Sequence, residues 1–394
     1  MSRIIVAGAL ANKPGNGGEA WVRLSWVLGL RELGNDVRFV EAIARQSCVD
    51  TAGNPTSFNS SVNRTWFAKV VQNFGLSDSA TLIYDDGAEF CGLSEYALHE
   101  FAEDCELLVN ISGHLTYAPV FERVGRRAYV DIDPGFTQFW HADGNAGSRM
   151  RGHDIFFTIG ENIGSPACSI PTCGITWHKI RPPVVLREWP ATIHPHFERF
   201  TTVANWRGPF GPVKCGEVTY GLKVHEFRKF FDLPQRTNLP FEIALNIHPG
   251  DSNDREAMCN HGWQLVAPSE FTADPSAFRA YIAGSSAEFS VAQSIYVQTA
   301  SGWVSDRTAH YLASGKPVLV QDTGSERGHL RGDGFLVFGT MEEAVAGAED
   351  IVKNYSRHSR GARAMAEEYF DSKKVLQSFL ETAFSKTSAP VIDQ

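Results

Sequence analysis

The first forty residues predict a strand, a glycine-rich loop, a helix and a second strand, which together make a complete βαβ unit. Residues 3–9 are an apolar run, and the loop LANKPGNGG leads from them into an amphipathic segment that starts near Glu19. A second short apolar strand follows at 36–40. In the segment between the two strands, apolar residues recur at helical spacing: Val22, Trp26, Leu30 and Leu33. Strands joined through a helix belong to parallel sheets, so the chain is expected to be an α/β protein.

The alternation of strands and helices continues along the chain and predicts two domains. In the first half we expect a helix at 94–104 and strands at 106–111 and 127–132; in the second half, strands at 200–204, 241–247, 263–266, 287–291 and 317–321. The proline-rich segment 166–195 is expected to be a crossing linker. A chain of 394 residues exceeds the size of one hydrophobic core. The predicted division is therefore 1–195, 196–362, and a C-terminal helical segment at 363–394, in which Asp371 is expected to cap the second part.

Charge and cysteine content exclude some classes of function. The formal net charge of -9 gives no general attraction for nucleic acid, so a nucleic-acid partner is not expected. The N-terminus lacks the pattern of a signal peptide, and no stretch approaches 18 apolar residues. Seven cysteines are an odd number, and Cys168 and Cys173 do not have CxxC spacing. We expect a cytoplasmic protein with reduced thiols, and no structural metal site.

The most informative motif is GWVSDRTAHYLASGKPVLVQDTG at 302–324, where a turn, a short helix and a buried strand follow one another. Free amides at the start of that helix would bind an anion. Ser305 is a credible N-cap, and the guanidinium of Arg307 suits phosphate oxygens. The alternative interpretation is an ordinary capped helix with a surface arginine.

Part of this motif, HYLASGKPVLVQDTG, resembles the donor-binding helix and the following strand and glycine loop of GT-B glycosyltransferases of the family 4 (group 1) type. The resemblance implies two Rossmann-like domains facing across a cleft, with the C-terminal domain holding the diphosphate and ribose of a nucleotide-sugar. Gly324 lies in the glycine loop of this match. The resemblance also implies that the C-terminal helix packs back on the N-terminal domain.

Two further segments are similar to the same family. GNGGEAWVRLSWVLGLRELGNDVRFVE resembles its opening, which implies that Gly17 and Gly18 lie against the donor phosphates or the transferred sugar. TTVANWRGP and YGLKVHEFRKFFDLP resemble the start of its second domain, which implies that Arg207 and Lys223 neutralise the leaving diphosphate. Lys214 competes with Lys223 for this role.

One departure from the family affects the donor site. Two glutamates eight positions apart usually precede the A-S-G segment, and the corresponding positions here hold Gly302 and His310. Asp306 is then a candidate for a ribose contact from the neighbouring turn. The family pattern therefore does not fix whether the reaction inverts or retains the configuration of the sugar.

Three residues are candidates for catalysis on the acceptor. His114 follows the strand 106–111, at the edge where ligands of parallel sheets collect. It resembles an active-site histidine of GT-B enzymes, which implies a general base or a hydrogen bond to the sugar. Asp131 and Asp133 end the next strand and are rival bases, although strand-end capping is their alternative role. Their Asp-x-Asp spacing resembles a metal motif of another glycosyltransferase architecture in the wrong domain context, so no catalytic metal is expected.

These patterns predict a metal-independent glycosyltransferase that moves a sugar from a nucleotide-sugar, as co-substrate, to a hydroxyl of a small molecule or glycan. No bound cofactor is expected. The alternatives are a nucleotide-sugar binding protein with a degraded site, a nucleotide-sugar epimerase, and a glycosyltransferase acting on a modified base in DNA.

Overall fold

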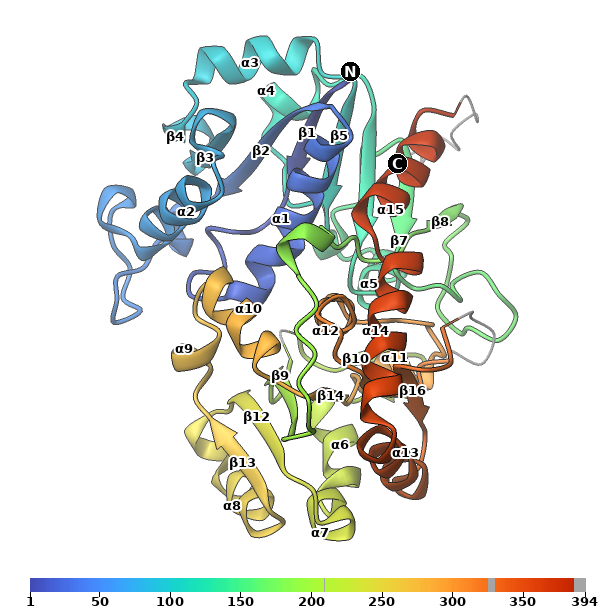
Figure 1. The fold of residues 1–394 in the computed structure, drawn as a ribbon. Helices are drawn as coiled ribbons and strands as arrows, with labels where there is room; N and C mark the ends of the chain where they lie inside the picture. Colours follow the sequence, from blue (N-terminus) through green and yellow to red (C-terminus); the bar gives the residue numbers. More distant parts are fainter. Residues whose placement is uncertain (209, 325–329, 386–394) are drawn as a thin grey trace.

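The computed structural model describes residues 1–208, 210–324 and 330–385 and contains two α/β domains, stacked one above the other in Figure 1. The N-terminal domain is built on an eight-stranded sheet, in which β4 is antiparallel and the other strands are parallel. In sheet order the strands are β4 (Glu89–Gly92), β3 (Ala80–Tyr84), β2 (Asp36–Ile43), β1 (Arg3–Ala7), β5 (Leu107–Ile111), β6 (Arg127–Asp131), β7 (Ile155–Thr158) and β8 (Trp177–Lys179).

The C-terminal domain is built on a six-stranded parallel sheet. In sheet order its strands are β13 (Trp263–Val266), β12 (Phe241–Asn246), β9 (Phe200–Asn205), β14 (Ala287–Ser290), β15 (Val318–Gln321) and β16 (Phe335–Phe338), and a separate hairpin is formed by β10 (Val213–Cys215) and β11 (Val218–Tyr220). These two sheets confirm the predicted pair of Rossmann-like domains.

Helices cover both sheets (Figure 1). In the N-terminal domain they are α1 (Gly17–Glu32), α2 (Val62–Asn73), α3 (Glu95–Glu103), α4 (Ala118–Phe121) and α5 (Phe136–Ala142). In the C-terminal domain they are α6 (Lys223–Phe227), α7 (Leu233–Thr237), α8 (Ser252–Asn260), α9 (Pro268–Phe271), α10 (Pro275–Ala283), α11 (Ser294–Gln298), α12 (Asp306–Ala313) and α13 (Met341–Lys353). The chain ends with α14 (Tyr355–Tyr369) and α15 (Ser372–Ala383), and Asp371 caps α15 as expected because its side chain accepts a hydrogen bond from the Lys373 amide.

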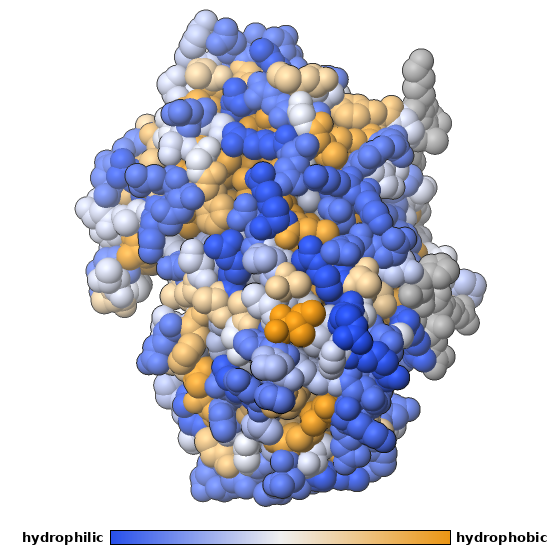
Figure 2. Space-filling view, viewed as in Figure 1, coloured by the Kyte–Doolittle hydropathy of each residue, from blue (hydrophilic) through white to orange (hydrophobic). Residues whose placement is uncertain are grey.

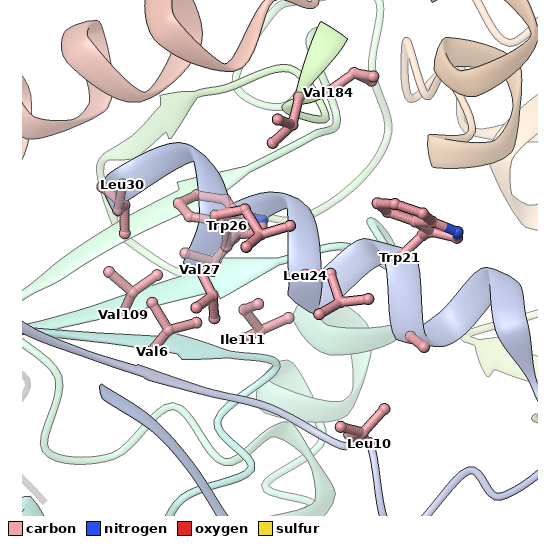
Figure 3. Close-up of a cluster of buried hydrophobic side chains, with 14 of the residues drawn as sticks. Val6, Leu10, Trp21, Leu24, Trp26, Val27, Leu30, Val109, Ile111 and Val184 are labelled. Carbon is pink, nitrogen blue, oxygen red and sulfur yellow. The ribbon is translucent and has the colours of Figure 1, made fainter. Parts of the chain in front are cut away.

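Twelve of the sixteen residues of helix α1 are buried. Asn16 caps it by accepting a hydrogen bond from the Glu19 amide, at 3.1 Å. Figure 3 shows its apolar side chains lying over strands β1 and β5, with Leu24, Val27 and Leu30 close to Val6, Val109 and Ile111. Burial of these apolar side chains is the main force that fixes the helix on the sheet.

The proline-rich segment 166–195 departs from its predicted structure. It was expected to be a linker throughout, but it contains β8, which pairs with β7 as the edge strand of the first sheet. Three residues are too few for a recognisable apolar alternation, and the prolines fall outside them. The predicted domain division near residue 196 stays a prediction, and it falls between β8 and β9.

The chain passes between the domains twice, and the two passages are joined. After β8 the chain descends to β9, and after α14 it returns to α15. Backbone hydrogen bonds connect the passages, from the Val184 amide to the Phe370 carbonyl at 2.8 Å and from the Ser372 amide to the Val184 carbonyl at 2.9 Å. Helix α15 then packs on α1, where the rings of Trp26 and Phe379 are 5.1 Å apart in a T-shaped contact.

The face of the molecule shown in Figure 2 is largely hydrophilic, with its hydrophobic residues in small separate groups. Within the described ranges, none of the helices combines the length and the hydropathy that a membrane crossing would require.

Candidate active site

A cavity of about 530 Å³ lies where the carboxyl ends of the second sheet face the loop that follows β1. Polar residues at the carboxyl ends of β9, β12 and β14 line this cavity. Ligands bind at that edge in open α/β sheets. Its wall includes Asn16, Gly18, Glu19, Asn205, Lys223, Asn246, Thr272, Gln293, Ser305, Asp306, Arg307 and His310. Five of the predicted donor-site residues therefore line one cavity: Gly18, Lys223, Ser305, Asp306 and Arg307.

Lys223 is a cation in this wall. Within the described part of the chain, its ammonium group forms no hydrogen bond or ion pair, and its side chain is only partly exposed. Burial and the nearby Arg307 guanidinium lower the pKa of Lys223 to about 7, and Glu288 partly opposes them. A cation held beside another cation, without a counter-ion of its own, is suited to an anionic ligand.

Arg307 lines the same cavity, but its guanidinium is anchored inside the second domain. It donates to Glu288 at 2.6 Å, to the Val203 carbonyl at 2.6 Å and to the Ser290 hydroxyl at 2.8 Å. The Glu288 side chain is fully buried. Arg307 therefore contributes positive charge to the wall, and much of its hydrogen-bonding capacity is used in holding α12 on β9 and β14.

Helix α12 begins at this wall. Ser305 is its N-cap, as predicted, and the Ser305 hydroxyl accepts a hydrogen bond from the Arg307 amide at 3.2 Å. The partial positive charge of the helix N-terminus favours an anion there. Asp306, the first residue of the helix, also lines the cavity. Burial raises the pKa of Asp306 to about 6, with Arg23 lowering it and Glu19 raising it.

The N-terminal domain closes the cavity from the other side. Gly18 and Glu19 line it, and the Glu19 carboxylate forms an ion pair with Arg23, one turn along α1. Gly17 is not in the wall: its amide donates to the Thr272 carbonyl of the second domain at 2.9 Å. The first turn of α1 therefore meets the second domain directly.

Besides Gly17, two of the predicted donor-site residues, Arg207 and Gly324, lie away from the cavity wall. Arg207 has an exposed side chain that forms an ion pair with Asp251. Gly324 approaches Asn162 of the first domain, whose amide donates to the Gly324 carbonyl at 2.8 Å, and residues 325–329 after it lie outside the described residues. Of the two competing lysines, Lys223 lines the cavity and Lys214 lies exposed in the β10–β11 hairpin.

His114 lines a second cavity of about 610 Å³, at the carboxyl ends of the first sheet, together with Lys13, Asp86 and Arg149. The Arg149 guanidinium lies 2.7 Å from Nδ1 of His114. An arginine only donates, so Nδ1 accepts and the neutral ring carries its proton on Nε2. Burial, followed by the charges of Arg23, Arg149 and Lys13, lowers the pKa of His114 to about 3. The ring is therefore arranged to donate a hydrogen bond from Nε2.

Asp131 and Asp133 have different surroundings. Asp131 is fully buried and accepts hydrogen bonds from Thr137, Gln138, Thr158 and the Asp133 amide, which gives it a structural role at the end of β6. Asp133 is partly exposed and accepts from the Tyr296 hydroxyl of the second domain at 3.1 Å. Burial, with the charges of Glu19 and Asp131, raises the pKa of Asp133 to about 7. In the described ranges, no three His, Cys, Asp or Glu side chains are grouped so as to hold a metal ion.

Sequence reasoning missed several polar residues of the first cavity. Asn205 and Asn246 end two neighbouring strands in register, and their side chains are hydrogen-bonded at 3.0 Å. Glu19 follows the Gly-Gly pair directly, and Gln293 follows β14. A polar residue at the end of each apolar strand was the available signal for three of these positions.

Two Rossmann-like sheets with a cavity between their carboxyl ends define the GT-B fold class, and solved structures of that class resemble this chain. The alpha-glucosyltransferase AGT in complex with UDP has a TM-score of 0.60 at 12% identity, covering 98% of this chain and 100% of that one. An alpha-glucosyltransferase in complex with UDP and a 13-mer DNA has a TM-score of 0.59 at 12% identity, with 97% and 98% covered. Sucrose-phosphate synthase from Thermosynechococcus elongatus has a TM-score of 0.55 at 9% identity, also with 97% and 98% covered.

No protein-family model matches the chain. No curated protein matches it either. At these identities the likeness to the solved structures shows the fold.

Proposed function

We propose that this chain is a glycosyltransferase that binds a nucleotide-sugar in the first cavity and transfers its sugar to a hydroxyl group of a small molecule or glycan. The observation that carries the proposal is Lys223. It is a partly buried cation that faces the cavity beside Arg307 and near the N-terminus of α12, with no ion pair among the described residues. A diphosphate supplies the counter-charge that Lys223 lacks.

The same wall suits the chemistry of transfer. Cleavage of the bond between the sugar and the phosphate leaves negative charge on the departing diphosphate. Lys223, the charge of Arg307 and the amide end of α12 are fixed before the reaction starts, so they stabilise that charge without reorganising. This step needs no metal ion from the protein, and nucleotide-sugar is the co-substrate. We therefore expect activity to persist in EDTA.

For the acceptor we propose the second cavity, which contains His114. It lies at the carboxyl edge of the first sheet and opens beside the loop that closes the donor cavity. Asp133 lines neither cavity wall, but it is the proposed base for the acceptor hydroxyl, because it is partly exposed where the two domains meet at the Tyr296 hydroxyl and its pKa is raised to about 7. His114 is proposed to donate a hydrogen bond to substrate.

A DNA acceptor is a second candidate. It is favoured by one observation, that alpha-glucosyltransferases of this fold were solved with DNA. The net charge of -9 acts against it. Retardation of a short duplex at 50 mM salt, lost at 200 mM salt, would support this acceptor.

The test is a binding and turnover screen of UDP-, GDP- and dTDP-sugars, with UDP-glucose first because solved neighbours hold UDP. The informative variant is Lys223→Met, with the exposed Lys214→Met as its matched control. Arg307→Ala is a poorer choice, because it leaves the buried Glu288 carboxylate without its partner. We expect wild type and Lys214→Met to bind and slowly hydrolyse the donor, and Lys223→Met to bind at least about tenfold more weakly.

Three results would separate the alternatives. A donor that binds and never turns over with any acceptor would favour a binding protein. A donor converted to another nucleotide-sugar without acceptor would show an epimerase. Absence of any nucleotide-sugar binding at millimolar concentration would overturn the proposal.

A further inference from the structure

The donor cavity has two ends of opposite charge. The wall inside the second domain carries Lys223 and Arg307, whereas the wall between the domains carries the carboxylates of Glu19 and Asp306. The charge of a nucleotide-sugar is also unevenly distributed, because its diphosphate is anionic and its sugar is rich in hydroxyl groups. The charge pattern therefore indicates how such a ligand lies in the cavity.

Asp306 and Arg307 follow each other at the start of α12, and successive helical residues point in directions about 100° apart. Arg307 turns to the sheet and binds Glu288. Asp306 instead feels the charges of Arg23 and Glu19, which belong to α1 of the first domain. In the part of the chain that the structure describes, no other residue donates a hydrogen bond to its carboxylate.

Glu19 faces Asp306 from the first domain. Burial alone would raise the pKa of Glu19, but Arg23 and Lys13 hold it below its usual value. Glu19 is therefore ionised at neutral pH. Its ion pair with Arg23, whose side chain is only 3% exposed, fixes the carboxylate at the cavity wall.

A second observation supports a polar ligand in this cavity. His310 is 2% exposed and Gln293 is 7% exposed, and both line the cavity. Nδ1 of His310 and Oε1 of Gln293 are buried and form no hydrogen bond within the described ranges. His310 lies four residues after Asp306, on the same face of α12. Buried polar atoms are normally paired, so these two atoms call for a partner from a ligand.

We propose that Glu19 and Asp306, one from each domain, form the subsite for the transferred sugar, and that this sugar is neutral rather than a uronic acid. The proposal rests on the proposed function. Sugar hydroxyl groups donate to the two carboxylates, and hydroxyl oxygens or protons satisfy Gln293 and His310. A uronic acid would bring a third carboxylate to this end and be repelled.

The test compares the affinities of wild type for UDP, UDP-glucose and UDP-glucuronate by calorimetry at pH 7.5. The two sugars differ only at C6. UDP lacks the transferred sugar, so its binding tests the proposed function separately. We expect UDP-glucose to bind at least about tenfold more tightly than UDP-glucuronate. Equal affinities of the two UDP-sugars, or tighter binding of UDP-glucuronate, together with normal binding of UDP, would overturn the sugar subsite and leave the donor site standing.

The matched variants are Asp306→Asn and Glu19→Gln, with the exposed Glu349→Gln of α13 as control. We expect the preference for glucose over glucuronate to fall below about threefold in Asp306→Asn and in Glu19→Gln. Glu349→Gln should keep the full preference. A preference that survives in both subsite variants would overturn the assignment. Should one variant fail to fold, the other variant and the wild-type ratio decide.

Discussion

Gly17 meets the main chain of Asp274 across the domain boundary. A Cβ atom placed on Gly17 would lie 2.2 Å from the Asp274 carbonyl oxygen and 2.9 Å from Cβ of Phe278. No side chain fits between these two segments without movement of the backbone. Glycine at this position is therefore what lets α1 start directly against the second domain.

Gly17→Ala is expected to push the two domains apart. The clash is with backbone, so it cannot be relieved by a rotamer change, and overpacking of this kind costs about 1–3 kcal/mol. Small-angle scattering should show a larger radius of gyration, and UDP-glucose should bind at least about tenfold more weakly. Gly211→Ala is the control, since nothing lies within 4 Å of its Cβ position. Unchanged scattering and affinity in Gly17→Ala would contradict this account.

Lys223→Met is expected to increase stability while it weakens ligand binding. The pKa of Lys223 is lowered to about 7 in the folded chain, so its charge is disfavoured there compared with the unfolded chain. Without ligand, the melting temperature should rise by about 2 °C, measured by differential scanning fluorimetry. A melting temperature below that of wild type, with UDP affinity intact, would show that the lysine has a structural role instead.

The affinity for UDP should fall as pH rises above 7. The diphosphate binds the protonated lysine, which predominates in the free protein below its pKa of about 7. Affinity is therefore expected to be level between pH 6.5 and 7 and to fall by up to about tenfold per pH unit above that. The lower limit avoids protonation of the terminal phosphate, whose second pKa is about 6. Calorimetry on Lys223→Met should show no such slope.

The same pKa predicts a stability slope. Between pH 7 and 10.5 the unfolded chain binds more protons than the folded chain, because the unfolded lysine stays protonated. The contribution of this group to stability therefore rises with pH across that window. Urea midpoints at pH 7 and pH 9 should differ less in Lys223→Met than in wild type. A larger difference in the variant would refute the assignment.

Asp133 and His114 are expected to affect turnover differently. Asp133→Asn should lower the rate at saturating donor at least about a hundredfold, the usual contribution of a general base. The wild-type rate should rise with pH through about 7 as the Asp133 carboxylate forms. His114→Gln keeps a donor group and should lose less than about tenfold, with the pH profile unchanged. A profile that is lost in His114→Gln instead would make the histidine the base.

Sequence patterns predicted the fold where local signals were strong. The strand at Trp263–Val266 has the predicted bounds, and α1 follows its glycine loop as expected. The short strand β8 was missed, since three residues in a proline-rich segment form a strand only because β7 offers them an open edge. That edge is a property of the assembled sheet.

The cavity was predicted in part. Lys223 and Ser305 come from motifs with a physical reason for binding phosphate, and both line the wall. Arg207 is positively charged, as Lys223 is, but Arg207 forms an ion pair with Asp251, forty-four residues later. Glu19 was missed because its role in the cavity wall depends on Asp306. Only the contact between the domains brings these two residues near each other. Pairing across the chain decides which charges remain free for a ligand.

The two passages between the domains, hydrogen-bonded at Val184, have a mechanical consequence. Because the two passages are hydrogen-bonded to each other, they cannot move independently, and any relative motion of the domains has to carry both segments together. A change beside Val184 is therefore expected to affect both passages at once without touching either cavity.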